Sequence, residues 1–471
     1  MEIIHVSAEC YPVAKAGGLG DVVGALPKYQ NQLGHTAKVV MPMYRTKFLY
    51  QHTFDEVHKG SFGMGEYYFN YTIIREKTDE LGFELYLVDI YGLLDREAVY
   101  GYNDDAERFT AFQIAVVDWL SYWAHQPDIV HVHDHHTGLV PFMMQHCYAY
   151  RNLSSIPTVL TIHNAQYQGS MGWDKSRYLP NWNSWEWGKL DWNNNINPLA
   201  SAVKCATKVT TVSQTYLEEM RQNANGLENL FEYEKGKCTG ILNGIDDVVW
   251  DPATDAYLDP NFTIEETTEG KLANKKVLCE QFELDIEKPL VIFIGRLVHE
   301  KAADLLPQAI FDSVYHMEGK MNFLVLGSGE PHVEWELENM KTQLAGYYNS
   351  RIGYNEKLSH QMYAGADFLL MPSRVEPCGL NQMYAMRYGT VPIVRNTGGL
   401  RDTVIDIGEP GGYGIRFNDA TVWDITYSIH RALEMYNEPG LLAETRKIIM
   451  ALDNSWENSA GQYINLYESL R

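Results

Sequence analysis

A glycine-rich run near the start of the chain has the composition of an anion-binding turn. Residues 15–22 read Lys-Ala-Gly-Gly-Leu-Gly-Asp-Val and separate a short apolar segment from a stretch with helical periodicity. Glycines let the backbone approach an anion closely, and a helix N-terminus offers unpaired N–H groups at a positive dipole end. Lys15 adds a positive charge, while Val23 stands where a dinucleotide-binding fingerprint has its third glycine. The run predicts a phosphate-binding turn; the alternative is a tight turn that binds no ligand.

Histidines gather at the ends of two other apolar runs. His131-Val132-His133-Asp134-His135-His136 ends one run, and His163-Asn164 opens a polar, glycine-containing loop after another. Four histidines beside an acid could hold a metal, but neighbouring side chains of a strand point to opposite faces and do not converge easily. We therefore predict no metal here. Ligands of open α/β sheets gather at the carboxyl ends of strands, so Asp134 and His163 are predicted to bind a sugar. A purely structural histidine is the alternative.

Two cations follow an apolar run in the second half of the chain. Arg296 comes directly after residues 290–295, and Lys301 follows five residues later. The planar fork of arginine and the point charge of lysine both suit a diphosphate. A solvated basic surface is the alternative, but Glu300 and Asp304 flank the pair and argue against a general basic patch.

A carboxylate and a glycine share the polar loop after another apolar run. Residues 371–382 read Met-Pro-Ser-Arg-Val-Glu-Pro-Cys-Gly-Leu-Asn-Gln, with a helix expected to begin near Leu380. Glu376 would face the sugar, and the N–H groups that follow it would face a phosphate. The alternative is a carboxylate that only caps the helix. Residues 395–400, Arg-Asn-Thr-Gly-Gly-Leu, predict a second glycine turn at the same sheet edge.

The apolar runs that carry these residues predict two doubly wound α/β domains. Stretches with helical periodicity separate the runs, and this alternation is typical of parallel sheets. The ten clearest runs are residues 3–7, 37–41, 83–90, 129–134, 158–164, 209–213, 290–295, 323–329, 368–373 and 391–395. An irregular acidic stretch at residues 246–269 interrupts the alternation, so we place the domains at 1–245 and 246–471, with the active site in the cleft between them.

Composition narrows the possible partners. The chain has 471 residues and a formal net charge of −23, which disfavours nucleic acid or an anionic membrane as a partner. No run approaches the roughly 18 apolar residues of a membrane span, and the acidic N-terminus does not resemble a secretion signal. The six cysteines form no C-x-x-C pair, so reduced thiols in a cytoplasmic protein are expected. An aromatic content of 12% suits sugar stacking, although large cores use aromatic residues too.

Eight segments along the chain resemble, in the same order, segments of bacterial glycogen synthases and plant starch synthases. The matching segments are residues 15–22, 163–169, 211–213, 240–246, 250–252, 295–297, 327–329 and 363–403. The resemblance implies the GT-B architecture, in which two Rossmann-like doubly wound domains face each other across a deep cleft. The first domain would bind the acceptor and the second the nucleotide-sugar, with the end of the chain packing back on the first.

The resemblance also implies roles for the candidate residues. Those around the donor and the transferred glucose would be, in the first domain, Lys15, Gly17, Gly18, Asp21, Asp134, His163 and Asn164. Those in the second domain would be Arg296, Lys301, Tyr354, Glu376, Cys378, Gly379 and Leu380. Asp134, His163 and Glu376 are expected to act at the glucose. Arg296 and Lys301 would neutralise the departing diphosphate, and Tyr354 would help hold the nucleoside base.

The implied reaction is retaining transfer of glucose from ADP-glucose or UDP-glucose to the non-reducing end of an α-1,4-glucan. It is expected to need neither cofactor nor metal, because cationic side chains stabilise the leaving group. A catalytically weak glucan-binding or regulatory protein on the same scaffold is the rival hypothesis. A phosphorylase is a further alternative, but no local sequence suggests a pyridoxal-phosphate lysine. The sequence leaves the donor nucleotide, the acceptor length and the oligomeric state open.

The chain departs from the family's pattern at several positions. His135 stands where the family usually has tryptophan, and Ala302 replaces the usual glycine after Lys301. Ala200 stands where lysine is common, and the tryptophan-rich residues 181–192 are unfamiliar. Tyr384 occupies the position of a second glutamate in many wider relatives, which these synthases commonly lack too. His135 and the diverged residues 169–213 favour the rival hypothesis, whereas the intact Lys15, Arg296, Lys301 and Glu376 favour the enzyme.

Overall fold

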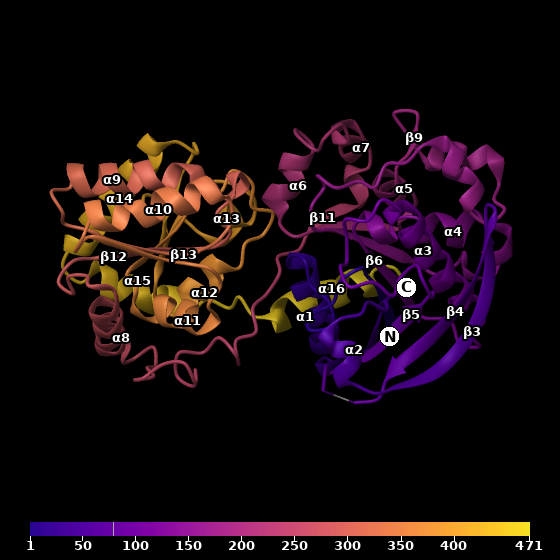
Figure 1. The fold of residues 1–471 in the computed structure, drawn as a ribbon, viewed down its shortest axis with the longest axis horizontal. Helices are drawn as coiled ribbons and strands as arrows, with labels where there is room; N and C mark the ends of the chain where they lie inside the picture. Colours follow the sequence, from indigo (N-terminus) through magenta and orange to yellow (C-terminus); the bar gives the residue numbers. More distant parts are fainter. Residues whose placement is uncertain (79) are drawn as a thin grey trace. The chain divides into compact units, whose positions relative to one another are not determined.

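The computed structural model describes residues 1–78 and 80–471 of the chain, which divides into two compact units (Figure 1). The first unit comprises Met1–Asn243 together with Trp456–Arg471, and the second comprises Gly244–Ser455. Each unit is built on a sheet flanked by helices, so the predicted α/β class is confirmed.

The first unit contains a nine-stranded sheet with the order β11-β10-β7-β6-β1-β2-β5-β4-β3. Its strands are β1 (Glu2–Val6), β2 (Thr36–Pro42), β3 (Phe54–Met64), β4 (Tyr67–Glu76), β5 (Glu84–Asp89), β6 (Ile129–His133), β7 (Thr158–Ile162), β10 (Lys208–Thr211) and β11 (Cys238–Gly240). The larger helices are α1 (Gly18–Gln32), α3 (Asp105–Ser121), α4 (Val140–His146), α5 (Pro198–Cys205), α6 (Gln214–Met220), α7 (Glu228–Tyr233) and α16 (Trp456–Glu468). The strands from β11 to β5 are parallel, and β3 and β4 extend the sheet as an antiparallel hairpin.

The second unit contains a six-stranded parallel sheet with the order β14-β13-β12-β15-β16-β17. Its strands are β12 (Leu290–Ile294), β13 (Asn322–Gly327), β14 (Tyr348–Ile352), β15 (Phe368–Met371), β16 (Val391–Arg395) and β17 (Ile415–Phe417). Its helices include α8 (Thr267–Phe282), α9 (Leu306–His316), α10 (Pro331–Gln343), α11 (Glu356–Gly365), α12 (Asn381–Arg387), α13 (Gly398–Thr403), α14 (Val422–Asn437) and α15 (Leu441–Met450). Each of the ten predicted runs overlaps a strand, because buried parallel strands are apolar on both faces.

The last helix of the chain belongs to the first unit. In Figure 1, α16 lies beside α1, and the two helices are in contact. Val22 and Leu26 of α1 share an apolar cluster with Tyr463, Ile464 and Tyr467 of α16. Burial of such side chains contributes about 1.5–3 kcal/mol each, so α16 is an integral part of this unit.

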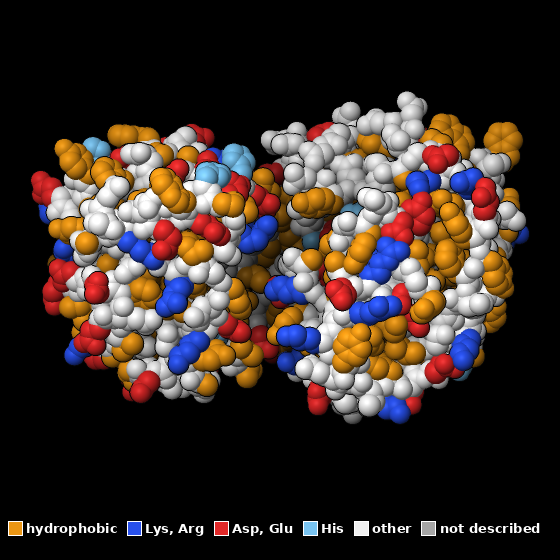
Figure 2. Space-filling view, in the orientation of Figure 1, with side chains coloured by type: hydrophobic (Ala, Val, Ile, Leu, Met, Phe, Trp, Pro, Cys, Tyr) orange, Lys and Arg blue, Asp and Glu red, His pale blue; other side chains and the backbone are white. Residues whose placement is uncertain are grey.

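The surface and the thiols agree with a folded globular chain. Over the face seen in Figure 2, acidic side chains are interspersed with basic ones on both units. None of the described helices is both long and apolar enough to span a membrane. All six cysteines are free, and five of them are buried.

Candidate functional site

The glycine turn of the first unit surrounds an internal carboxylate. Glu9, just after β1, accepts hydrogen bonds from the backbone N–H groups of Ala16 (2.6 Å) and Gly17 (2.9 Å). Its other oxygen accepts a hydrogen bond from the Tyr100 hydroxyl at 2.6 Å. Lys15 lies on the turn and pairs with Asp21 at 2.7 Å. Two of the predicted anion-binding N–H groups therefore already bind an anion, which the protein itself supplies.

The opposite side of this turn is open. A Cβ atom added to Gly17 or Gly18 would meet nothing within 4 Å. The Lys15 side chain is 43% exposed beside them. A phosphate approaching the turn would therefore meet Lys15 and the start of α1, because Glu9 occupies the N–H groups of Ala16 and Gly17.

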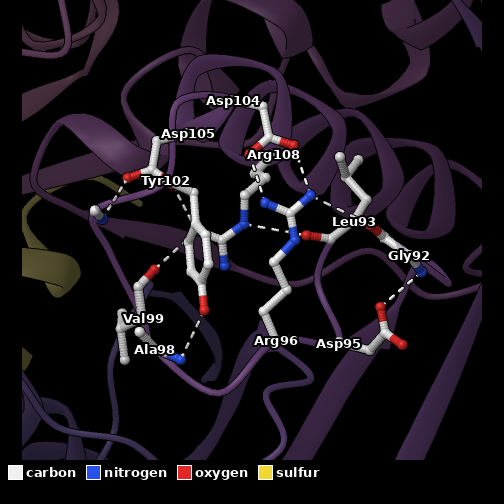
Figure 3. Close-up of polar contacts among 11 residues, drawn as sticks. Gly92, Leu93, Asp95, Arg96, Ala98, Val99, Tyr102, Asp104, Asp105 and Arg108 are labelled. Atoms are coloured by element: carbon white, nitrogen blue, oxygen red, sulfur yellow. Dashed lines mark hydrogen bonds and ion pairs between the residues drawn. The ribbon is translucent and has the colours of Figure 1, made fainter.

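The loop that carries Tyr100 is held by two arginines (Figure 3). Arg96 donates two hydrogen bonds to Asp104, and the buried Arg108 donates to two carbonyl oxygens of the loop. The Tyr102 ring lies 4.8 Å from the guanidinium of Arg96 and 4.6 Å from that of Arg108. This network holds the loop on both sides of Tyr100 and so fixes the hydroxyl that binds Glu9. Sequence reasoning missed Glu9 and Tyr100, since neither lies in a recognisable motif.

Asp134 has a strained backbone at the carboxyl end of β6. Its φ of 56° and ψ of −173° lie in a region that side chains other than glycine rarely adopt. Such conformations cost about 1–3 kcal/mol and concentrate at functional sites. Its buried Oδ1 accepts the backbone N–H of His163 at 2.7 Å. Asp134 and the neighbouring pair His163-Asn164 are thus brought together at the ends of the adjacent strands β6 and β7.

Burial shifts the titration of both side chains. Desolvation raises the pKa of the Asp134 carboxyl to about 7, although backbone hydrogen bonds at His163 and Asn164 oppose the rise. Desolvation also lowers the pKa of His163 to about 3. At neutral pH His163 is therefore uncharged, whereas Asp134 is poised between its two charge states.

The histidines lie closer together than alternation along one strand suggested. His131 and His133 are two residues apart and share a face of β6, and His5 stands opposite His131 on β1. Their ligand atoms lie within 4.8 Å of one another. The prediction wrongly considered only immediate neighbours on one strand. However, both ring nitrogens of each of these histidines have a hydrogen-bond partner in the protein.

The structure shows what the ring of His135, the residue that replaces the family's usual tryptophan, packs against. Gly169, with a φ of +72°, lies so close that an added Cβ would come within 2.4 Å of the His135 ring. The ring is therefore packed against the loop that begins at His163.

In the second unit, Lys301 and Glu376 form an ion pair at the ends of neighbouring strands. Lys301 follows β12, Glu376 follows β15, and their charged atoms are 2.6 Å apart. The same Glu376 oxygen accepts a hydrogen bond from the Ser373 hydroxyl at 2.9 Å. The N-cap residue of α12 is Leu380, and the Glu376 oxygen is bound by Lys301 and Ser373. Glu376 therefore orients a cation, which the capping alternative did not predict.

A second ion pair joins the same two loops. Arg374 donates two hydrogen bonds to Asp304, at 2.6 and 2.9 Å, and its backbone N–H donates to the Glu300 carbonyl. Ala302, buried beside Lys301, has a left-handed backbone with a φ of 54°. This conformation explains why glycine is usual there, and shows that alanine preserves the turn.

Two predicted residues of this unit are largely exposed. Arg296 has a 67% exposed side chain, 3.9 Å from Glu300. Tyr354, which follows the edge strand β14, is 85% exposed. Both are accessible to a ligand, but neither is held by the contacts that fix Lys301 and Glu376.

The second glycine turn packs directly against the Glu376 loop. The Gly399 N–H donates to the Glu376 carbonyl at 3.1 Å, and Gly379 uses a φ of +75° in the same loop. The buried Cys378 lies between Glu376 and Gly379 in the chain, and a Cβ added to Gly399 would come within 2.1 Å of the Cys378 carbonyl oxygen. The predicted donor-binding residues Cys378, Gly379 and Leu380 thus belong to a tightly packed loop.

Replacing Gly399 with alanine should therefore lower the free energy of unfolding by about 1–3 kcal/mol, the usual cost of overpacking. Chemical denaturation measures this change. Gly461→Ala is the matched control, because a Cβ there meets nothing within 4 Å. Alanine in that helix should stabilise the protein by about 0.5–1 kcal/mol. Similar effects of the two substitutions would contradict the proposed packing.

Comparisons with known proteins cover the whole chain. Residues 2–233 match the family described as the starch synthase catalytic domain, and residues 275–439 match glycosyl transferases group 1. The chain is 53% identical over 467 residues to a glycogen synthase from Flavobacterium johnsoniae, covering 99% of this chain and 98% of that protein. It is similar to the structure of the catalytic domain of starch synthase IV from Arabidopsis thaliana bound to ADP and acarbose, with a TM-score of 0.86, 32% identity and 99% coverage of both chains. A sucrose-phosphate synthase from Thermosynechococcus elongatus shares the fold, with a TM-score of 0.63 at 16% identity, covering 100% of this chain and 98% of that one.

Proposed function

Because the chain belongs to the family of bacterial glycogen synthases and plant starch synthases, we propose that it transfers glucose from ADP-glucose or UDP-glucose to the non-reducing end of an α-1,4-glucan. The anomeric configuration is retained. ADP-glucose is the favoured donor, since the similar Arabidopsis starch synthase has ADP bound. The observation that carries the proposal is the Lys301–Glu376 pair, which places an oriented cation at the carboxyl end of a parallel sheet.

The proposed chemistry separates charge. As the bond from glucose to the diphosphate breaks, positive charge develops on the sugar and negative charge on the leaving phosphate. Lys301 and Arg296 stabilise the phosphate, and Glu376 keeps the Lys301 ammonium in one position. Asp134 and His163 bind the glucose from the first unit. The leaving phosphate accepts the proton of the attacking glucan hydroxyl, so the step needs no carboxylate nucleophile and no cofactor.

Nucleotide release from ADP-glucose and from UDP-glucose, each with and without glycogen, tests this function. We expect ADP release that depends on glycogen and lengthens its outer chains. Glu376→Ala, which removes the partner of Lys301, is the inactive control. Failure of both donors, with glycogen binding retained, would favour the glucan-binding protein instead.

A further inference from the structure

A continuous chain of hydrogen bonds crosses the buried interior of the first unit and ends at the His163 ring. Every link joins residues of the first unit. The links are Thr210 Oγ1 to the Leu160 carbonyl (3.2 Å), Thr161 Oγ1 to Thr210 Oγ1 (2.6 Å), His131 Nε2 to Thr161 Oγ1 (2.6 Å), His131 Nδ1 to the Tyr467 hydroxyl (2.6 Å), Gln30 Nε2 to the Tyr467 hydroxyl (3.2 Å), His5 Nε2 to Gln30 Oε1 (2.7 Å), His5 Nδ1 to His133 Nε2 (3.0 Å), and His133 Nδ1 to His163 Nε2 (3.1 Å).

The far end of this chain has a defined direction. The Leu160 carbonyl can only accept, so we assign the Thr210 proton to this contact, and Thr210 then accepts from Thr161. This direction agrees with the Gln30 amide, whose N–H faces Tyr467 and whose oxygen faces His5. The Thr161 hydroxyl, having donated its proton, accepts from His131 Nε2. His131 Nδ1 is then a bare lone pair that accepts from the Tyr467 hydroxyl.

The same direction continues to the site. Tyr467 has used its proton, so its oxygen accepts from the Gln30 amide N–H, which turns the Gln30 carbonyl toward His5. His5 therefore carries its proton on Nε2 and accepts at Nδ1 from His133 Nε2. His133 in turn accepts at Nδ1 from His163 Nε2. A hydrogen bond at each step thus determines which nitrogen of the next ring holds the proton.

These hydrogen bonds require each of the four histidine rings to be neutral, with one N–H and one lone pair. The pKa values of the rings meet this condition. Burial lowers the pKa of His5 to about 4 and that of His163 to about 3, and it lowers the pKa values of His131 and His133 as well. Within the described part of the chain, His163 Nδ1 has no hydrogen-bond partner, and this atom is not fully buried. It therefore remains available to a ligand.

We propose that Gln30 and Tyr467 are positioning residues that hold His163 in the tautomer with its proton on Nε2. The Nδ1 lone pair of His163 is then an acceptor for a hydroxyl of the bound sugar. This last assignment rests on the proposed function, whereas the tautomer does not. Tyr467 lies on α16, so the final helix of the chain sets the hydrogen-bonding character of a residue in the site.

Nuclear magnetic resonance of the full-length protein labelled with ¹⁵N-histidine tests the proposal, because the ring nitrogen shifts report which atom carries the proton. His163→Gln identifies the His163 signals by their loss. In the unmodified protein we expect the proton on Nε2. Gln30→Met removes the acceptor for His5, and Tyr467→Phe removes the group that orients Gln30. Each should raise the ratio of the Nδ1–H to the Nε2–H form by about twofold to tenfold, the effect of losing one hydrogen bond.

Two further variants separate positioning from general damage. Gln30→Glu keeps an acceptor for His5 and should leave the His163 tautomer unchanged. Tyr348→Phe removes a buried hydroxyl that donates to the Leu337 carbonyl (2.9 Å) in the second unit, and should change nothing at His163. A proton on Nδ1 in the unmodified protein, or an unchanged tautomer in both Gln30→Met and Tyr467→Phe, would overturn the proposal.

Kinetics then connect the tautomer to transfer. Gln30→Met and Tyr467→Phe should lower kcat in proportion to the fraction of His163 that still carries its proton on Nε2, as the spectra measure it, while Gln30→Glu and Tyr348→Phe should retain kcat. A kcat that does not follow this fraction would overturn the acceptor role of Nδ1. Absence of transfer by the unmodified protein would instead refute the proposed function, and the spectra would still decide the tautomer.

Discussion

Replacing Lys301 with methionine should lower kcat for glucose transfer by about 100- to 1000-fold, the usual effect of removing one group that stabilises developing charge. The Lys301 ammonium lies 2.6 Å from Glu376 in a mostly buried pair, so its position is fixed before the substrate binds. Its proposed role is in the transition state, where negative charge builds on the diphosphate. The KM for glycogen should therefore change much less than kcat. Steady-state kinetics with ADP-glucose and glycogen measure both quantities.

Substitutions at Lys301 and Glu376 also distinguish an effect on catalysis from an effect on stability. Lys301→Met leaves the buried Glu376 carboxylate without its cation, which should cost about 3 kcal/mol. Adding Glu376→Gln removes the unpaired charge, so the double variant should regain most of this stability and remain inactive. Lys77→Met, which breaks an exposed pair with Asp55 (2.8 Å), should change stability by about 0.5 kcal/mol at most. Normal transfer by Lys301→Met would refute its role.

Ten of the parallel strands were predicted because their burial leaves a simple pattern, whereas the parallel edge strands β11, β14 and β17 were missed. β6 and β15 are buried along their entire length and appear in the sequence as uninterrupted apolar or histidine-containing runs. The hairpin of β3 and β4 was missed, because exposed polar residues make up much of β3. Antiparallel strands at a sheet edge can face water, so their sequences lack a continuous apolar run.

The side chains of the candidate site, too, could be predicted only where a local sequence pattern marks them. Asp134, Glu376 and the cations could be found because each follows a strand, where ligands of α/β sheets gather. Glu9 and Tyr100 could not, because their contact joins residues that are 91 positions apart in the sequence. The link between His131 and Tyr467 spans 336 positions. Such pairings follow from the completed tertiary structure, and a single sequence carries no local signal of them.

Asp134→Asn should stabilise the protein at neutral pH while lowering transfer activity by about 100-fold. Burial raises the pKa of this carboxyl from 3.8 to about 7. The unfolded chain therefore releases the proton first as the pH rises, and the folded state loses stability between about pH 4 and pH 7. The whole loss amounts to about 4 kcal/mol. Asparagine cannot ionise, yet its amide oxygen can still accept the His163 N–H.

Urea unfolding of both proteins between about pH 5 and 8 measures the difference, which should grow toward pH 7 and then level off. Asp174→Asn, at an exposed aspartate of the same unit, should change stability by no more than about 0.5 kcal/mol at every pH. Transfer by the unmodified protein should rise through pH 7 as the Asp134 carboxylate forms, and the variant should lack this rise. Parallel unfolding free energies across the range would show that Asp134 ionises like an exposed acid. A functional site that lowers stability should become more stable when its buried charge is removed. If Asp134→Asn gives no such gain, the Asp134 carboxylate does not destabilise the fold, and only the backbone strain at this residue remains as a cost.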